Sequence, residues 1–248
     1  MDKDRLRALL DGVRDGKITV ESASAELHDL PFSDLGFALV DHHRALRQGV
    51  PEVIFGERKT VAQILAIANA IVSHGATCLI TRVDEDKAPA ILAEFPTARH
   101  APVARTVVIA SGTIKQRGTG PVAVIAAGTS DLPVAEEACE TLFALGRDVI
   151  RLYDVGVSGI HRLLAKRDAF ASATVLIVVA GMEGALPSVV GGLTDRPVIG
   201  VPTSVGYGAA FAGITALASM LTSCASGVTV VNIDNGFGAA FAAARIDR

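Results

Sequence analysis

The chain has 248 residues, of which half are hydrophobic and 4% aromatic, and its formal net charge is −3 at pH 7. A chain of this length can bury a substantial core in one or two domains. The slightly acidic balance provides no basic patch, which argues against nucleic acid as a partner. The charged start of the chain differs from a signal peptide, and three cysteines fit neither a closed set of disulfides nor a paired metal motif. We therefore expect a reduced, cytoplasmic protein.

The first part of the chain indicates a small domain of helices followed by an α/β unit. Apolar residues recur at helical spacing over residues 1–47, with breaks at Gly16 and Pro31, and a third helix is expected to begin at Ser33. Short Val- and Ile-rich strands then alternate with helices, one of which is capped by Thr60. The expected strands are 53–55, 76–83 and 105–111, and the expected helices are 60–73 and 84–95.

The second part of the chain indicates a larger α/β domain that follows a polar segment at 114–121. Five apolar strands alternate with helices there, which predicts a parallel, doubly wound sheet. The segment 197–233 has no charged side chain, but Pro202 and several glycines divide it into strand, helix and strand, which argues against a membrane-spanning helix. The expected helices are 131–145, 159–170, 186–191, 208–222 and 235–244. The predicted fold class is α/β, with a smaller helical and α/β domain at 1–117 and a doubly wound domain at 118–248.

Ligands of such sheets bind beyond the carboxyl ends of the strands, and two motifs there could contact phosphate. Ser130 and Asp131 lie where a strand passes into a helix, so Asp131 is either a helix N-cap alone or part of an anion or ribose site. Ser158, His161 and Arg162 follow the next strand and form either a solvated helix face or a phosphate contact. Both motifs leave a structural and a ligand-binding interpretation open.

Two residues could carry chemistry. Glu183 lies between glycines after the third strand, as either a helix-terminal acid or a general base whose basicity burial would raise. Cys224 lies in a turn that we expect at the same edge of the sheet, as either an inert small side chain or a nucleophilic thiolate. The sequence alone favours the inert interpretation for Cys224, and for Cys78 and Cys139 we expect no other.

The second domain resembles a known family. AAGTSD, VSGIHR, GMEGALP and NIDNGFGAA stand in the order of the corresponding motifs of aminoimidazole ribonucleotide carboxylase (PurE). Ala185 stands where that family has a catalytic histidine, and the Ser-x-His-Arg turn has one additional residue. The resemblance implies a PurE-like fold, and these differences favour a reaction other than purine carboxylation.

A more specific resemblance covers essentially the whole chain. The segments 41–60, 181–193 and 223–240 resemble the LarB family, which begins nickel-pincer nucleotide synthesis. The resemblance implies carboxylation of the pyridinium ring of nicotinic acid adenine dinucleotide and hydrolysis of its phosphoanhydride, with pyridinium-3,5-biscarboxylic acid mononucleotide and AMP as products. Cys224 would add to the ring as a thiolate, and Glu183 would act as the base or position the hydrolytic water.

The resemblance also implies the partners and binding residues. We expect no tightly bound cofactor, carbon dioxide or bicarbonate as co-substrate, Mg²⁺ as a candidate ion, no membrane partner, and a homo-oligomer, an octamer as among PurE relatives. The rival interpretations are a purine-type carboxylase or mutase, which would not need Cys224, and a non-catalytic nucleotide-binding module. The chain has no Gly-x-Gly-x-x-Gly fingerprint after a strand, which argues against a dinucleotide oxidoreductase. The expected substrate-binding residues are Ser130, Asp131, Ser158, His161, Arg162, Gly181, Met182, Gly184, Pro202, Ser204, Asn232, Asp234, Asn235, Gly236, Arg44, Glu52 and Lys59.

Overall fold

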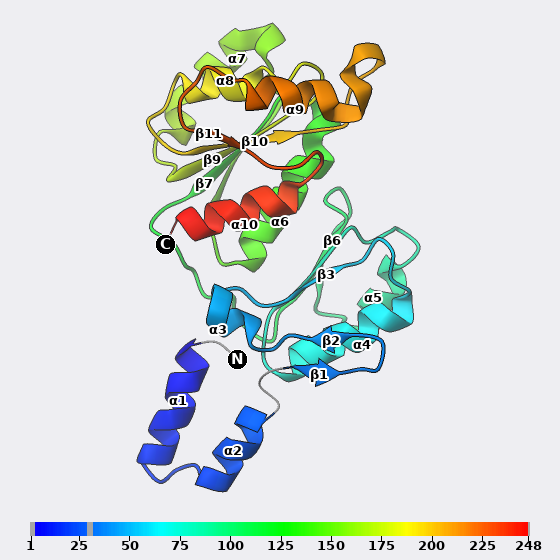
Figure 1. Cartoon of the computed structure of the whole chain (residues 1–248), viewed down its shortest axis with the longest axis vertical. Helices are drawn as coiled ribbons and strands as arrows, with labels where there is room; N and C mark the ends of the chain where they lie inside the picture. Colours follow the sequence, from blue (N-terminus) through cyan, green and yellow to red (C-terminus); the bar gives the residue numbers. More distant parts are fainter. Residues whose placement is uncertain (1–2, 29–31, 248) are drawn as a thin grey trace. The chain divides into compact units, whose positions relative to one another are not determined.

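The computed structural model describes residues 3–28 and 32–247 (Figure 1). The chain divides into two compact units. One comprises the described residues up to His100 together with Thr106–Ile114, and the other comprises Ala101–Arg105 together with the chain from Lys115 onward. Within the described residues, no helix is long and apolar enough to cross a bilayer.

The first unit contains short helices and a four-stranded sheet. The sheet has the order β3-β4-β6-β5, with β3 and β4 parallel and β6 antiparallel to β4. The expected cap of α4 is confirmed, because the Thr60 hydroxyl accepts a hydrogen bond from the backbone N–H of Gln63. The elements are α1 (Lys3–Arg14), α2 (Val20–His28), β1 (Ser33–Asp34), β2 (Leu39–Val40), α3 (Arg44–Gln48), β3 (Val53–Phe55), α4 (Val61–Ser73), β4 (Cys78–Thr81), α5 (Ala88–Glu94), β5 (Arg99–Ala101) and β6 (Thr106–Ile109).

The expected helix beginning at Ser33 is wrong. The chain forms a tight antiparallel hairpin there, with Ser33 opposite Val40, and only the short α3 follows it. The Asp34 side chain accepts a hydrogen bond from the Gly36 N–H at 2.7 Å, and Gly36 has a left-handed φ of 79°. This local turn replaces the helical hydrogen bonds, because Asp bonds readily to the backbone two residues on and Gly adopts positive φ without strain.

The second unit confirms the predicted doubly wound sheet. Its five strands are all parallel and have the order β11-β10-β9-β7-β8. The strands are β7 (Val122–Ala126), β8 (Val149–Leu152), β9 (Val175–Ala180), β10 (Val198–Pro202) and β11 (Val228–Val230). The helices and turns between them are η1 (Thr129–Asp131), α6 (Leu132–Ala144), η2 (Val157–Gly159), α7 (Ile160–Leu164), η3 (Arg167–Phe170), α8 (Leu186–Gly191), η4 (Gly208–Gly213), α9 (Ile214–Leu221) and α10 (Gly236–Ile246).

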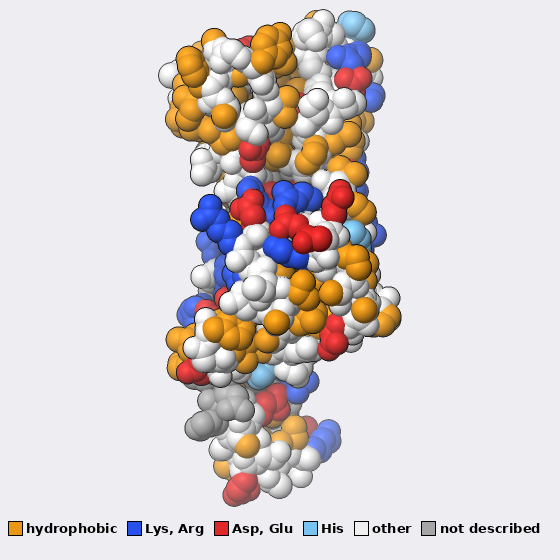
Figure 2. Space-filling model, turned by 90° about the vertical axis from the view of Figure 1, so that its right-hand side faces the viewer, with side chains coloured by type: hydrophobic (Ala, Val, Ile, Leu, Met, Phe, Trp, Pro, Cys, Tyr) orange, Lys and Arg blue, Asp and Glu red, His pale blue; other side chains and the backbone are white. Residues whose placement is uncertain are grey.

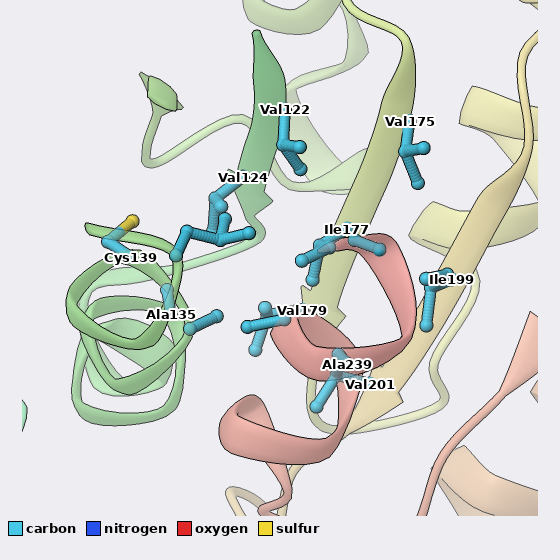
Figure 3. Packing of buried hydrophobic residues seen from close by; sticks show 14 of the residues in the cluster. Val122, Val124, Ala135, Cys139, Val175, Ile177, Val179, Ile199, Val201 and Ala239 are labelled. Carbon is cyan, nitrogen blue, oxygen red and sulfur yellow. The ribbon is translucent and has the colours of Figure 1, made fainter. Parts of the chain in front are cut away.

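Helices cover both faces of this sheet (Figure 1). On one face, α6 and α10 pack on the valines and isoleucines of β7, β9 and β10, as Figure 3 shows. Ala239, Ala240 and Ala243 of α10 are fully buried, and such small side chains let α10 lie close to the sheet and to α6. On the other face, Leu163, Leu186 and other side chains of α7 to α9 form a second core. Both faces are therefore buried, as the continuous apolar strands require.

Two expected helices of the second unit are each divided into two segments. The segment expected as a helix at 208–222 is a 3-10 segment, η4, followed by α9, because Phe211 and Ala212 have left-handed φ values of 44° and 50°. The segment expected at 159–170 divides into α7 and the 3-10 turn η3. The helical spacing of apolar residues cannot predict such local changes of backbone conformation.

The buried Asp247, near the end of the second unit, bonds to Thr119 near its start and forms an ion pair with Arg147. The Asp247 carboxylate accepts hydrogen bonds from the Thr119 N–H at 2.9 Å and hydroxyl at 2.6 Å, and from the Arg147 guanidinium at 3.1 Å. We expect Asp247→Ala to lower the free energy of unfolding by about 3 kcal/mol, since it removes the buried carboxylate that pairs with Arg147. Denaturant melts measure the change. The exposed Asp195→Ala control should stay within about 0.5 kcal/mol of wild type; an equally small effect for Asp247→Ala would contradict the expectation.

The loss of stability in Asp247→Ala should depend on pH. Burial raises the pKa of Asp247, but the hydrogen bonds from Thr119 and the charge of Arg147 outweigh it and lower the pKa below the ordinary 3.8. The pKa of Asp247 is therefore lower in the folded state than in the unfolded state. At a pH above the unfolded-state pKa, the ionised carboxylate contributes its full stabilisation, and this contribution is lost as the pH falls through the folded-state pKa. The stability difference between wild type and Asp247→Ala should therefore shrink below about pH 4.

Candidate active site

A pocket of about 300 Å³ opens at the carboxyl ends of the parallel strands. The chain passes from β7 to β8 on one side and later to β9 on the other, so the β7–β9 boundary is a topological switch point. Ligands of doubly wound sheets bind at such points. The pocket is lined by Ala127, Gly128, Ser130, Asp131, Gly156, Val157, Ser158, Ala180, Gly181, Met182, Glu183, Ala185, Leu186 and Val205.

Asp131 lines the pocket at the start of α6 and is 4% exposed. One carboxylate oxygen accepts from the Thr203 hydroxyl at 2.7 Å, and the other accepts from the Gly128 N–H at 3.0 Å. Burial raises the pKa of this carboxyl, and the hydrogen bonds from Thr203 and Gly128 partly oppose that shift. Asp131 thus closes the turn before α6 and also faces the pocket.

Glu183 also lines the pocket, in the loop between β9 and α8. Met182 has a left-handed φ of 53°, and its N–H donates to the Val205 carbonyl at 2.8 Å. Gly184 has a φ of 67° and lies against the backbone of Ala216, so a Cβ there would be 2.8 Å from the Ala216 carbonyl oxygen. The loop is therefore held on both sides of Glu183. The Glu183 side chain itself is exposed in the single chain, so the burial expected for a general base is not provided within one chain.

Left-handed backbone recurs around this edge of the sheet. Asp154, Met182 and Asp234 follow β8, β9 and β11 and have φ values of 58°, 53° and 54°. Non-glycine residues seldom adopt this conformation, and such strain concentrates at functional sites. The backbone thus marks the same edge as the pocket.

Ser158 lines the pocket, whereas His161 and Arg162 lie on α7 just beyond the lining residues. The Arg162 guanidinium pairs with Asp154 at 2.6 Å and lies over Gly159, where a Cβ would be 2.6 Å from Arg162 Nε. Arg162 therefore lies beside the Ser158 turn and pairs with Asp154.

The loops after β10 and β11 are bonded to each other. The Asp234 carboxylate accepts from the Ser204 N–H at 2.8 Å, and the Asp234 N–H donates to the Pro202 carbonyl at 2.9 Å. Asn235 caps α10 by accepting from the Gly238 N–H at 2.8 Å, and Gly236 packs against the backbone of Val134. The Asn232 side chain bonds to the next residue's N–H. None of these predicted residues lines the pocket in the described structure.

The structure does not bring Cys224 to the pocket within one chain. Cys224 lies in the turn before β11, whereas Glu183 follows the carboxyl end of β9. Ala225 packs against Gly191 at the carboxyl end of α8, and Ser223 bonds to Ser188 at 2.7 Å. The expectation that this turn faces the same edge as Glu183 is therefore wrong for the single chain, because sequence order places the turn at the start of a strand.

Cys224 nevertheless differs from the other two cysteines. Cys78 and Cys139 are fully buried, and burial raises the pKa of each thiol to about 12. Cys224 is exposed. Because the nucleophile must reach its substrate, the exposed Cys224 is the candidate among the three cysteines.

Three predicted residues belong to the first unit. Arg44 begins α3 and donates to Gln48 at 3.4 Å, Glu52 accepts from the Asp41 N–H at 2.6 Å, and Lys59 donates to the Phe55 carbonyl at 3.2 Å. Of the remaining predicted residues, the structure brings Ser130, Asp131, Ser158, Gly181, Met182 and Glu183 to one pocket. In the described parts of the chain, no group of three His, Cys, Asp or Glu side chains is arranged to hold a metal ion.

Sequence reasoning missed Thr203 and Val205. The buried Thr203 hydroxyl donates to the pocket residue Asp131, and Val205 lines the pocket. Both follow β10. Their only sequence signal is their position after a buried strand. The pocket residues Gly128 and Gly156 are easier to predict from the sequence. Each is a glycine after a strand, and a glycine lets a ligand approach the backbone.

Comparisons with known proteins match both parts of the chain. Residues 32–111 match the model of the LarB/PurE-like N-terminal domain, and residues 121–247 match that of AIR carboxylase. An uncharacterised protein of Methanocaldococcus jannaschii is 39% identical over 242 residues, which are 94% of this chain and 93% of that protein. An N5-carboxyaminoimidazole ribonucleotide mutase of the same organism is 35% identical over 50% of this chain and 77% of its own length. The phosphoribosylaminoimidazole carboxylase of Saccharomyces cerevisiae is 33% identical over 50% of this chain and 22% of its own length.

Proposed function

Because the chain belongs to the family that joins a LarB/PurE-like N-terminal domain to an AIR carboxylase domain, we propose that it carboxylates the pyridinium ring of nicotinic acid adenine dinucleotide. It then hydrolyses the phosphoanhydride, which releases AMP and pyridinium-3,5-biscarboxylic acid mononucleotide. The observation that carries this proposal is the charge of the pocket. Asp131 and Glu183 line it, and none of its described lining residues is Lys, Arg or His.

A pocket of this charge suits the cationic nitrogen of a pyridinium ring. A pyridinium ring is attracted to nearby carboxylates, and the attraction grows where water is excluded. Val157, Met182, Leu186 and Val205 supply apolar surface for the faces of the ring. The ring of nicotinic acid adenine dinucleotide also carries a carboxylate, so the two pocket carboxylates attract the side of the ring that holds the cationic nitrogen. We expect Arg162 and His161, which lie on α7 beyond the pocket, to contact the phosphates of the dinucleotide.

The proposed chemistry uses the Cys224 thiolate. A pyridinium ring is electron-poor and does not attack carbon dioxide. Addition of the thiolate forms a carbon–sulfur bond and a neutral dihydropyridine, whose enamine carbon then attacks carbon dioxide. Glu183 removes the proton from the newly carboxylated carbon, and the sulfur leaves as thiolate, which restores the aromatic ring. Water then cleaves the phosphoanhydride. Carbon dioxide or bicarbonate is the co-substrate, and we propose that the enzyme needs no tightly bound cofactor. Mg²⁺ is a candidate ion for the phosphates, and we propose that the enzyme acts in the cytoplasm.

This chemistry needs Cys224 and Glu183 at one site, so we propose that a second copy of the chain supplies the cysteine, in a homo-oligomer that we expect to be an octamer. Two observations support this. Cys224 is exposed and outside the pocket of its own chain, and Glu183 is also exposed. In addition, hydrophobic side chains lie on the surface of the second unit, at the top of Figure 2. Tyr207, Phe211, Ile214 and Leu221, which lie in or beside η4 and α9, are exposed. Exposed apolar patches of this kind mark interfaces.

A mixed-subunit experiment tests the shared site. Cys224→Ser and Glu183→Gln should each be nearly inactive alone. If each site combines residues from two copies, co-expressed variants should recover roughly a quarter of wild-type activity, the fraction of sites that receive both native residues. Cys224→Ser co-expressed with the Cys224→Ser/Glu183→Gln double variant is the control and should recover none. Absence of recovery in mixed oligomers, confirmed by sedimentation, would place both residues in the same chain's site.

A purine-type carboxylase or mutase is the second candidate, because the mutase and carboxylase relatives match half of this chain. Incubation with each substrate distinguishes the two. Nicotinic acid adenine dinucleotide with bicarbonate should yield AMP, whereas aminoimidazole ribonucleotide or its N5-carboxy form should remain unchanged. Turnover of the aminoimidazole ribonucleotide alone would establish the purine-type reaction instead. Ala185 lines the pocket and offers no titratable group for that reaction.

A further inference from the structure

One hydrogen bond crosses three neighbouring strand ends at the pocket. Thr203 follows β10 and is 0% exposed, and its hydroxyl donates to the Asp131 carboxylate at 2.7 Å. Asp131 lies beyond β7, and the sheet order places β9 between β10 and β7. The bond from Thr203 to Asp131 therefore passes across the end of β9.

Gly181 leaves the space for this bond. It is the first residue after β9, and a Cβ there would lie 2.7 Å from Thr203 Oγ1 and even closer to the Val205 carbonyl oxygen. The Thr203 N–H donates to the Ala180 carbonyl at 3.0 Å. Thr203 and Asp131 thus hold the point at which β9 passes into the Glu183 loop.

The loop itself needs such support. Met182 has a left-handed φ, which is unfavourable for a side chain with a Cβ, and Gly184 has a positive φ on the other side of Glu183. The Met182 N–H is bonded to the Val205 carbonyl, two residues beyond Thr203. A shift of Thr203 would therefore move both the start of the loop and the carbonyl that restrains it.

We propose that Thr203 and Asp131 form a positioning pair that fixes the loop carrying Glu183. Thr203 is not among the residues that line the pocket, so its effect on the reaction passes through Asp131 and the loop that carries Glu183. This inference rests on the proposed function for its kinetic consequence, but its structural part concerns the loop alone and can be tested without any substrate.

The structural test is amide hydrogen exchange of the Glu183 loop in three variants. Thr203→Val keeps the shape of the side chain and removes the hydroxyl, whereas Thr203→Ser keeps the hydroxyl. Thr141→Val is the matched control, since Thr141 is also 0% exposed and its hydroxyl has no hydrogen-bond partner in the described structure. In Thr203→Val, exchange at Met182 and Gly184 should accelerate by about tenfold or more while the β7 amides keep their protection. Thr203→Ser and Thr141→Val should exchange as wild type.

The kinetic test follows turnover of nicotinic acid adenine dinucleotide. In Thr203→Val, kcat should fall by about tenfold or more with KM within about threefold of wild type, because a misplaced base slows chemistry more than binding. Thr203→Ser should restore kcat. Unchanged exchange at Met182 and Gly184 in Thr203→Val would overturn the positioning role. Accelerated exchange in an enzyme whose wild type does not turn over this substrate would support the pair and contradict the proposed function. Faster exchange with an unchanged kcat would overturn the link from the pair to Glu183.

Discussion

Cys224→Ser should abolish carboxylation and leave the fold intact. The proposed reaction begins with thiolate addition to the ring, and a serine hydroxyl without an adjacent base is a far weaker nucleophile. Cys224 is exposed, so the nearly isosteric change removes no buried contact and the melting temperature should match wild type. We expect turnover to fall by at least about three orders of magnitude.

The ring adduct gives this variant a second readout. NAD also contains an electron-poor pyridinium ring, so mixing it with the wild-type protein should produce near-ultraviolet absorbance from a dihydropyridine. Cys224→Ser should lack this band, because the adduct forms through the Cys224 thiolate. Cys78→Ala and Cys139→Ala are the controls and should keep the band, because burial holds both thiols protonated with a pKa of about 12. Full activity in Cys224→Ser would exclude covalent catalysis and favour the purine-type reaction.

Glu183→Gln should lower kcat by about a hundredfold or more, with KM and dinucleotide binding nearly unchanged. Glutamine keeps the shape of the side chain and loses its basicity, so the ring proton is no longer removed after carboxylation. The NAD adduct band should survive in this variant, because adduct formation precedes the step that needs the base. Stopped-flow absorbance and steady-state turnover separate the two effects.

Asp195→Asn is the control for this change, since it also replaces a carboxylate by an amide on the surface of the second unit. A Glu183→Gln variant with wild-type kcat would show that Glu183 is only an acid near the start of α8. Loss of the adduct band in Glu183→Gln would instead assign Glu183 to the addition step.

The sequence was sufficient to predict the second unit's fold because its strands are long apolar runs separated by amphipathic helices. The order of elements and the parallel sheet follow from that pattern, as the buried strands β7, β9 and β10 confirm. The hairpin at Ser33–Asp34 was missed because one Asx turn outweighed helical periodicity. The 3-10 segment at Gly208–Gly213 was missed because left-handed backbone at Phe211 and Ala212 has no signature in residue spacing.

The pocket was predictable in part. Residues that directly follow β7, β8 and β9, such as Asp131, Ser158 and Glu183, meet at one edge because parallel strands end together. Thr203 was not predictable, because its role depends on reaching across β9 to Asp131. The prediction that Cys224 lies at the carboxyl ends of the strands is wrong for the single chain. Cys224 is in the turn before β11, and that turn lies at the start of the strand.

The most direct test of the proposed carboxylation is mass spectrometry of the product formed from nicotinic acid adenine dinucleotide and carbon-13 bicarbonate. We expect AMP together with a pyridinium mononucleotide that carries one additional, labelled carboxyl group, and neither product with Cys224→Ser. Recovery of unchanged dinucleotide from a folded, oligomeric wild-type protein would contradict the proposed reaction.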